Sequence, residues 1–364
     1  LTGSGITILM IEQKIEKLAA YCDRILLLHG GKQIAFDTPQ KVFSMPDLAD
    51  YGIQEPAFTR ICKAEHVTLP DGTYPVTVEE AAGVLKERHA GRAEAKGAAK
   101  ADKKKNSEVL SEEQFLIKNL DFSYLPDVPV LKALNMRLDK RPTAIIGQNG
   151  AGKTTLVKLL KGLLKPVSGN IYFHGEDISG KTVAMLAGNI GYVFQNPDDQ
   201  IFKYNVMDEI MFGPMNIGMD PKRAEEEAKR ALELTGLSGK EKENPYDLEL
   251  YERKMTAIAS VLAMDTDVLI LDEPTKGLDP LRKQALGHLL QQLQVEGLTI
   301  IMASHDMVFS ARFANQCALL FDGAIVAQEA PHQFFQSNFF YTTPINRLLR
   351  PQDSAALTWE EVGR

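Results

Sequence analysis

The 364-residue chain is longer than one typical domain and can bury a large core. Its 41 basic and 48 acidic residues give a net charge of −7, which argues against a general nucleic-acid-binding surface. Three scattered cysteines lack the spacing of a metal site, no apolar run approaches the roughly 18 residues that span a bilayer, and no signal peptide is visible. These features suit the reducing cytosol, where the protein would act at a membrane only through a partner.

The start of the chain repeats a segment near its end. Residues 6–10 match residues 298–302 at an offset of 292, and the same offset aligns Gly31 with Gly323. Both copies predict a strand, then an amphipathic helix, then a hairpin that turns at a glycine. Because an internal repeat decides architecture, residues 1–85 are expected to be the C-terminal part of a first domain.

The remaining boundaries follow from composition. Residues 86–112 are rich in Ala, Lys and Glu with almost no large apolar side chains, which predicts a flexible or transiently helical linker. Residues 113–340 have the length and patterning of a complete domain. Residues 341–364 form a small C-terminal extension that echoes the tail at 56–81. Such tails either join two domains or pack on their own domain.

The most informative segment is 147–155, which fits the phosphate-binding pattern G-x-x-x-x-G-K-[ST]. An apolar strand is predicted before it, at 143–146, and leucines at helical spacing follow it. In that context the glycines let backbone N–H groups converge on a triphosphate at the positive end of a helix. Lys153 would reach the β- and γ-phosphates, and Thr154 would offer its hydroxyl to Mg²⁺. The predicted nucleotide-binding residues of this segment are Gly147, Asn149, Gly150, Gly152, Lys153, Thr154 and Thr155.

Further polar side chains stand where predicted strands end. Gln195 ends one apolar strand, Asp272 and Glu273 end a second, and His305 follows a third. In a parallel sheet such residues gather at the carboxyl ends of the strands, beside the phosphate loop. The chain has no Asn-Lys-x-Asp motif for reading guanine, which favours ATP as the nucleotide.

This order of motifs resembles the ATP-binding cassette (ABC) ATPase family over about residues 113–340. The resemblance implies an α/β fold of the P-loop NTPase type, with a mostly parallel sheet core, an antiparallel β subdomain and a helical subdomain. It implies that Asp272 holds Mg²⁺ through water and that Glu273 is the general base. It also implies that Gln195 touches Mg²⁺ and signals to a membrane partner, while His305 contacts the γ-phosphate. Tyr124 would stack on adenine; a half-buried strand aromatic is the alternative.

Residues 195–202 resemble the Gln-Asn-Pro-Asp-x-Gln segment of energy-coupling factor ATPases, the cobalt-type cassettes. This resemblance implies vitamin or metal-ion uptake from the cytoplasmic face of the cell membrane. The implied partners are a transmembrane coupling subunit, a substrate-binding membrane subunit and a second ABC domain. The repeat then implies a tandem-cassette protein, whose sequence here begins within its first cassette.

The family signature, usually Leu-Ser-Gly-Gly-Gln, is replaced by Leu-Glu-Leu-Tyr-Glu at 248–252. Glu249 would repel a γ-phosphate and Tyr251 would crowd it. The first copy has Gln13 at the position 292 residues before His305. Both departures fall in one composite site, so one site is expected to bind ATP and the other to hydrolyse it. The alternatives are a soluble tandem-cassette ATPase acting on the ribosome and a regulatory subunit with little turnover.

Overall fold

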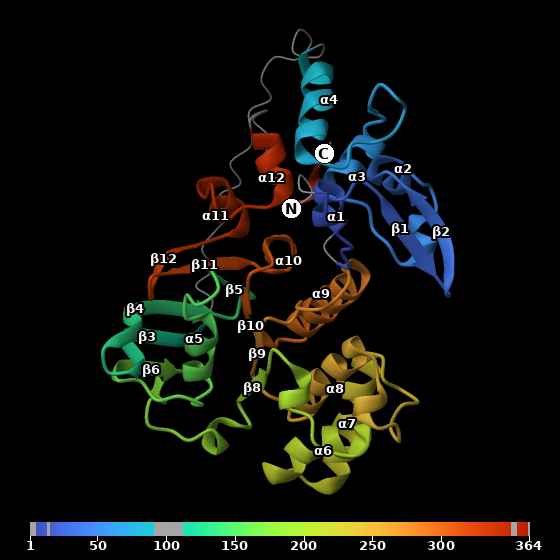
Figure 1. Cartoon of the computed structure of the whole chain (residues 1–364). Helices are drawn as coiled ribbons and strands as arrows, with labels where there is room; N and C mark the ends of the chain where they lie inside the picture. Colours follow the sequence, from blue (N-terminus) through green and yellow to red (C-terminus); the bar gives the residue numbers. More distant parts are fainter. Residues whose placement is uncertain (1–4, 13–14, 91–111, 351–354, 363–364) are drawn as a thin grey trace. The chain divides into compact units, whose positions relative to one another are not determined.

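The computed structural model describes residues 5–12, 15–90, 112–350 and 355–362 (Figure 1). They fall into two compact units: a smaller one of residues up to 106 with 279–281 and 342–364, and a larger one of 107–278 and 282–341. Gln13 and most of the predicted linker lie outside the described residues. Within the described part of the chain, no helix has the length and apolar character needed to cross a membrane.

The larger unit is built on a six-stranded sheet in the order β12-β11-β5-β10-β9-β8. Neighbouring strands run parallel except β11 and β12, which form an antiparallel hairpin. Strands β5, β8, β9 and β10 are buried along their whole length, which explains their continuous apolar runs. The strands are β5 (Thr143–Ile146), β8 (Ile190–Val193), β9 (Val268–Asp272), β10 (Thr299–Ser304), β11 (Gln316–Phe321) and β12 (Ala324–Glu329).

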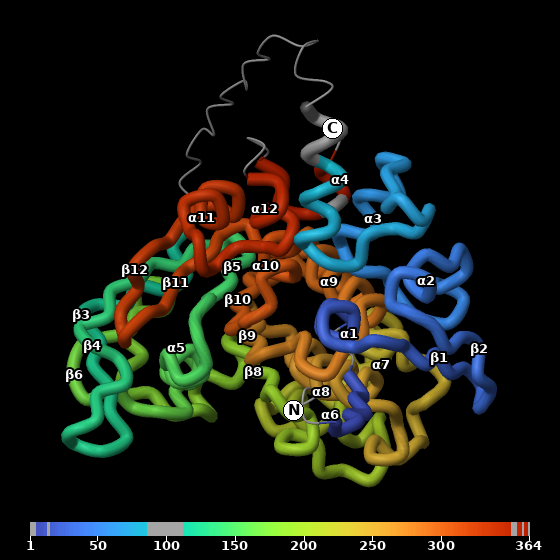
Figure 2. The backbone as a smooth tube through the Cα atoms, turned by 45° about the horizontal axis from the view of Figure 1, so that its top comes forward, coloured from blue at the N-terminus to red at the C-terminus, as the bar shows by residue number. Residues whose placement is uncertain are grey.

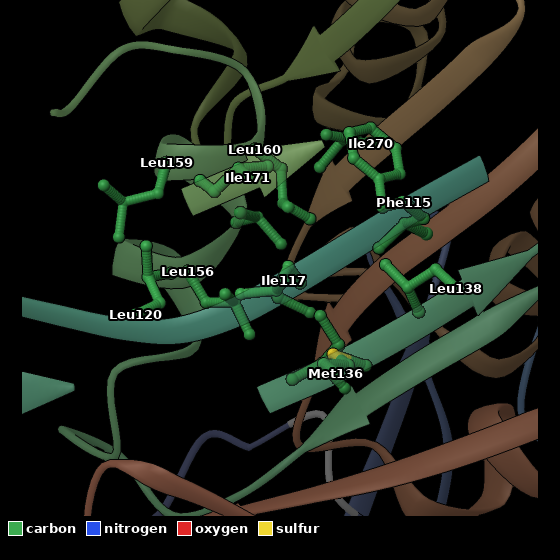
Figure 3. Packing of buried hydrophobic residues seen from close by; sticks show 14 of the residues in the cluster. Phe115, Ile117, Leu120, Met136, Leu138, Leu156, Leu159, Leu160, Ile171 and Ile270 are labelled. Atoms are coloured by element: carbon green, nitrogen blue, oxygen red, sulfur yellow. The ribbon is translucent and has the colours of Figure 1, made fainter. Parts of the chain in front are cut away.

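A second, antiparallel sheet in the order β4-β3-β6-β7 shares one hydrophobic core with helix α5 and with β9 of the first sheet. The alternating burial of β3 and β4 leaves one face of this sheet to the core. Figure 3 shows this core, with Phe115, Ile117, Met136 and Leu138 from the sheet and Leu156 and Leu160 from α5. The elements are β3 (Glu113–Leu125), β4 (Val128–Asp139), α5 (Lys153–Leu160), β6 (Ser168–Phe173) and β7 (Glu176–Asp177).

A helical subdomain lies beside β8. Its helices α6 (Val206–Asn216), α7 (Pro221–Thr235) and α8 (Leu250–Leu262) lie together in Figure 2. Local signals set their ends: the side chains of Asn205 and Asp220 cap the first turns of α6 and α7, and Gly236 in the left-handed region ends α7. Helices α9 (Pro280–Val295), α10 (Met307–Phe313) and α11 (Pro331–Ser337) follow along the chain.

The internal repeat is present in the structure as well as in the sequence. Strand β1 (Ile25–His29) pairs with β2 (Lys32–Asp37) in the register of β11 and β12, residue for residue at the same offset. Both hairpins shift register at the corresponding point, after Leu27 and after Leu319. Helix α1 (Ile15–Tyr21) likewise corresponds to α10 at this offset.

The strand predicted at residues 6–10 is wrong. Residues 5–12 form no strand, and Ile6, Leu9 and Ile11 are exposed. The matching segment β10 is a strand because it is held between β5 and β9. No described strand pairs with residues 5–12, so their backbone lacks the hydrogen-bond partners that a strand requires.

The two tails pack against each other within the smaller unit. Helices α3 (Ala57–Ala64) and α4 (Val78–Ala90) belong to the first tail, α12 (Pro344–Leu349) belongs to the second, and α2 (Pro39–Phe43) precedes them. Helices α3, α4 and α12 share one buried core, which includes Phe58, Ile61, Cys62, Leu85, Ile345 and Leu348. The structure therefore joins one tail to the other.

Candidate nucleotide-binding site

The loop between β5 and α5 has a backbone that favours glycine. A Cβ on Gly147 would lie 2.5 Å from the carbonyl oxygen of Leu320 on the neighbouring strand β11. Gly150 and Gly152 have φ of +83° and +99°, in the left-handed region that other residues avoid. Gly152 also forms the N-cap of α5. The loop can therefore turn tightly enough to aim its N–H groups outward at the start of the helix.

Lys153 folds back across this loop. Its Nζ donates to the carbonyl oxygens of Gly147 and Gln148 at 3.0 and 3.1 Å. The same nitrogen lies 3.6 Å from Oε1 of Glu273, and both side chains are almost fully buried. The carbonyls and the carboxylate thus hold a desolvated cation beside the loop, where it can meet phosphate oxygens.

Thr154 and Asp272 converge from α5 and from the end of β9. The Thr154 hydroxyl donates to Oδ1 of Asp272 at 3.0 Å, and burial raises the pKa of that carboxyl. A hydroxyl and a carboxylate are hard oxygen donors of the kind that Mg²⁺ prefers, so these residues fit that ion. In the described part of the chain no group of three or more His, Cys, Asp or Glu side chains could hold a metal.

Glu273 and His305 form a second pair at the ends of β9 and β10. Oε2 of Glu273 lies 2.5 Å from Nδ1 of His305, and the His305 backbone N–H donates to the same oxygen at 3.3 Å. Glu273 has φ of +47°, a strained conformation for a residue with a side chain. Such strain is found where function fixes the direction of a side chain. Glu273 is buried and His305 is half exposed, so the pair stands at the edge of the site.

The remaining predicted residues lie around this centre. The Tyr124 hydroxyl is 3.2 Å from Oγ1 of Thr155, and Tyr124 is 59% exposed, so it remains accessible to a base. Asn149 is exposed in the loop. The Gln195 carbonyl accepts from Nζ of Lys254 at 3.1 Å, while its side chain has no hydrogen-bond partner among the described residues. Among the described residues, no hydrogen bond therefore joins the Gln195 amide to Asp272.

The chain that carries this site is similar to known proteins. A family model for ABC transporters matches residues 131–276. The energy-coupling factor transporter ATP-binding protein EcfA of Methanothermobacter thermautotrophicus is 38% identical over 240 residues, which cover 65% of this chain and 77% of that protein. This chain belongs to the ABC transporter ATPase family. It carries an ABC ATPase domain, and ATP hydrolysis is characteristic of these cassettes.

Two further relatives of this ABC ATPase extend the comparison. A Bacillus thuringiensis protein, provisionally named an ABC transporter ATP-binding protein, is 33% identical over 361 residues. That match covers 98% of this chain but 63% of the relative, so the chain spans less than two thirds of that protein. The structure of cbiO1 from Clostridium perfringens, part of the ABC transporter complex cbiONQ, superposes with a TM-score of 0.60 at 33% identity. It covers 67% of this chain and 95% of cbiO1, which confirms the predicted fold class.

In this ABC ATPase, side chains of the protein itself cover the start of α8 at the signature segment, residues 248–252. The Glu249 backbone N–H, at the start of α8, donates to Oε2 of Glu252 at 3.3 Å, and Oε1 of Glu252 accepts from Lys240 at 2.8 Å. The Glu249 carboxylate lies 3.5 Å from the Arg282 guanidinium, which also stands 4.6 Å above the Tyr251 ring. Two carboxylates and a ring surround this helix start, where a phosphate would need uncovered N–H groups.

Sequence reasoning missed two buried side chains of this ABC ATPase. The Tyr192 hydroxyl donates to Oδ2 of Asp272 at 3.1 Å, from a strand that the sequence identified only as apolar. Lys254 connects α8 to the Gln195 backbone, and burial lowers its pKa to about 8. The available signals were a tyrosine within an apolar strand and a lysine at the charged start of a helix, but neither indicates its partner.

Proposed function

We propose that the chain is the ATP-binding and ATP-hydrolysing subunit of an importer of the energy-coupling factor type, serving vitamin or metal-ion uptake. The observation that carries this proposal is the convergence of Lys153, Thr154, Asp272, Glu273 and His305 around one phosphate loop. The relatives EcfA and cbiO1, together with the segment at 195–202, favour this branch of the family.

Each side chain of the site then has its own role in ATP hydrolysis. The loop and Lys153 bind the β- and γ-phosphates of ATP, while Thr154 and Asp272 hold Mg²⁺, which neutralises phosphate charge when bound. Glu273 accepts the proton of the attacking water, because its carboxylate is buried and oriented by its hydrogen bond from His305. His305 is exposed enough to meet the γ-phosphate, and Gln195 reports the state of the site to a partner.

A groove beside the site supports a membrane partner. It has a volume of about 320 Å³ and lies between β8 and the helical subdomain. Aromatic side chains form much of its wall, and Phe202 and Phe212 remain 52% and 38% exposed. Exposed aromatic rings around a cavity are typical of surfaces that bind another protein. We propose that a cytoplasmic segment of the transmembrane coupling subunit binds there, which would place the chain at the membrane surface.

The repeat supports a tandem cassette. In the second copy, one edge of β11 pairs with β12 and the other edge pairs with β5, the strand that leads into the phosphate loop. In the first copy Leu26 and Leu28 are 47% and 60% exposed, whereas the corresponding Ala318 and Leu320 are fully buried. We propose that β1 pairs in the same way with a parallel strand of a first cassette. The natural gene product should then bind two ATP molecules, and calorimetry that finds one would contradict the tandem form.

One experiment separates the importer from the ribosomal alternative. Tagged protein is purified from solubilised membranes and, in parallel, tested for cosedimentation with ribosomes. A transmembrane subunit should copurify with the unaltered protein, and Phe212→Glu in the groove should lose it. Val295→Glu, at an exposed position outside the groove, serves as the control and should keep it. Copurification of ribosomes in place of a membrane protein would overturn the proposal.

A further inference from the structure

The Tyr192 hydroxyl is a buried donor next to the Mg²⁺-binding groups proposed above. Tyr192 is 5% exposed, and its hydroxyl donates to Oδ2 of Asp272, which is itself 3% exposed. The Tyr192 ring stands edge-on to Phe194, with centroids 4.9 Å apart and an interplanar angle of 79°. Burial and this ring contact fix the direction in which the hydroxyl points.

The strand register explains why a tyrosine is needed at this position. Tyr192 on β8 lies opposite Ile270 on the parallel strand β9, so Asp272 stands on the same face two residues further along. Two residues of strand correspond to about 7 Å, a span that a phenol ring with its hydroxyl covers. Phenylalanine would fill the same space without the donor, and shorter hydroxyl side chains would fall short of the carboxylate.

Each oxygen of the Asp272 carboxylate receives one hydroxyl. Thr154 donates to Oδ1 and Tyr192 donates to Oδ2. Because the Thr154 proton is committed to Asp272, the lone pairs of its oxygen stay available to a metal ion. The rotamer of Thr154 therefore depends on the orientation of Asp272, and that orientation depends on the second donor. Groups that orient metal ligands in this way commonly change metal affinity by about 10- to 100-fold.

We propose that Tyr192 is a positioning residue for the magnesium–nucleotide site: its hydroxyl fixes the Asp272 carboxylate, which in turn holds the Thr154 hydroxyl in the orientation that receives Mg²⁺. The inference rests on the proposed function, since it takes Thr154 and Asp272 as the groups that meet Mg²⁺. It adds a residue outside the phosphate loop and outside the carboxylate pair to that site.

The test is the Mg²⁺ dependence of nucleotide binding to the purified chain carrying Tyr192→Phe. Trinitrophenyl-ATP fluorescence is followed while Mg²⁺ is titrated, and again in excess EDTA. The variant should need about tenfold more Mg²⁺ for half-maximal tight binding, with affinity in EDTA changed by less than about twofold. Tyr246→Phe is the matched control, because its hydroxyl donates to the Ile201 carbonyl at 2.6 Å away from the metal-binding groups. Unchanged Mg²⁺ dependence in Tyr192→Phe overturns the proposal, and so does an equal loss with and without Mg²⁺.

A double-mutant cycle adds a measurement that distinguishes positioning of Asp272 from a purely structural role of Tyr192. If Tyr192 acts through Asp272, Tyr192→Phe should have no further effect on the Mg²⁺ requirement in an Asp272→Ala background, which has no acceptor for the Tyr192 hydroxyl. Additive effects of the two substitutions would overturn the positioning role. Absence of nucleotide binding by the unaltered chain would overturn the proposed function as well. Nucleotide binding with unchanged Mg²⁺ dependence in the variant would overturn this inference alone.

Discussion

Glu273→Gln should abolish ATP turnover and leave ATP binding intact. The Glu273 carboxylate is buried, accepts from Nδ1 of His305 at 2.5 Å and lies 3.6 Å from Nζ of Lys153. Glutamine has the same shape and can keep one hydrogen bond to His305, but its amide cannot accept the proton of the attacking water. General bases contribute about 10²- to 10⁴-fold to rate, so the loss corresponds to about 3 to 5 kcal/mol of transition-state stabilisation.

Binding should not weaken, because the substitution removes a negative charge from beside Lys153 and the incoming phosphates. The assay is phosphate release by the natural gene product with its partners at saturating ATP, together with the dissociation constant for ATP. Glu176→Gln is the control: that carboxylate is exposed and pairs with Lys181 at 2.7 Å, away from the proposed site. Turnover of Glu273→Gln within about twofold of the unaltered protein would refute the assignment of Glu273 as base.

Three further outcomes follow from single residues. Gly147→Ala should lower thermal stability and abolish ATP binding, because its Cβ would meet a strand carbonyl at 2.5 Å; Gly188→Ala, with nothing within 4 Å, should do neither. Burial lowers the pKa of Lys161 from 10.5 to about 8. The unfolded chain holds that proton up to higher pH, so the free energy of unfolding should rise between pH 8 and 10.5, by at most about 3 kcal/mol. Lys161→Met should reduce that rise in denaturant titrations; an equal rise would contradict the origin assigned to it. Glu249→Ala should change phosphate release by less than about twofold, since this signature is expected to serve the other site, whereas a tenfold loss would count against unequal sites.

The sequence predicted the parts of the fold that depend on local pattern. The phosphate loop, the buried strands and the polar residues at their ends could be predicted. Hydrophobic periodicity, glycine spacing and the position of a residue after an apolar run can all be read from neighbouring residues in the sequence. The repeat at an offset of 292 was visible for the same reason. The two copies agree in the structure even in their register shifts, which follow Leu27 and Leu319.

Features that depend on distant partners could not be predicted. Tyr192 and Asp272 are 80 residues apart, and nothing near either one indicates the hydrogen bond between them. The strand at 6–10 was predicted from apolar residues alone, but a strand also needs neighbours to complete its hydrogen bonds, and residues 5–12 have none among the described strands. The joining of the two tails depends on α12 reaching α3 and α4 across most of the chain.

The most direct test of the central claim is solute uptake by cells that carry Glu273→Gln in the natural gene. Accumulation of a panel of radiolabelled vitamins and divalent metal ions is compared with the unaltered strain and with Glu176→Gln. The account predicts that uptake of one solute is lost in Glu273→Gln and retained in Glu176→Gln. Unchanged uptake of every solute, with a defect in protein synthesis instead, would contradict the importer and favour the ribosomal alternative.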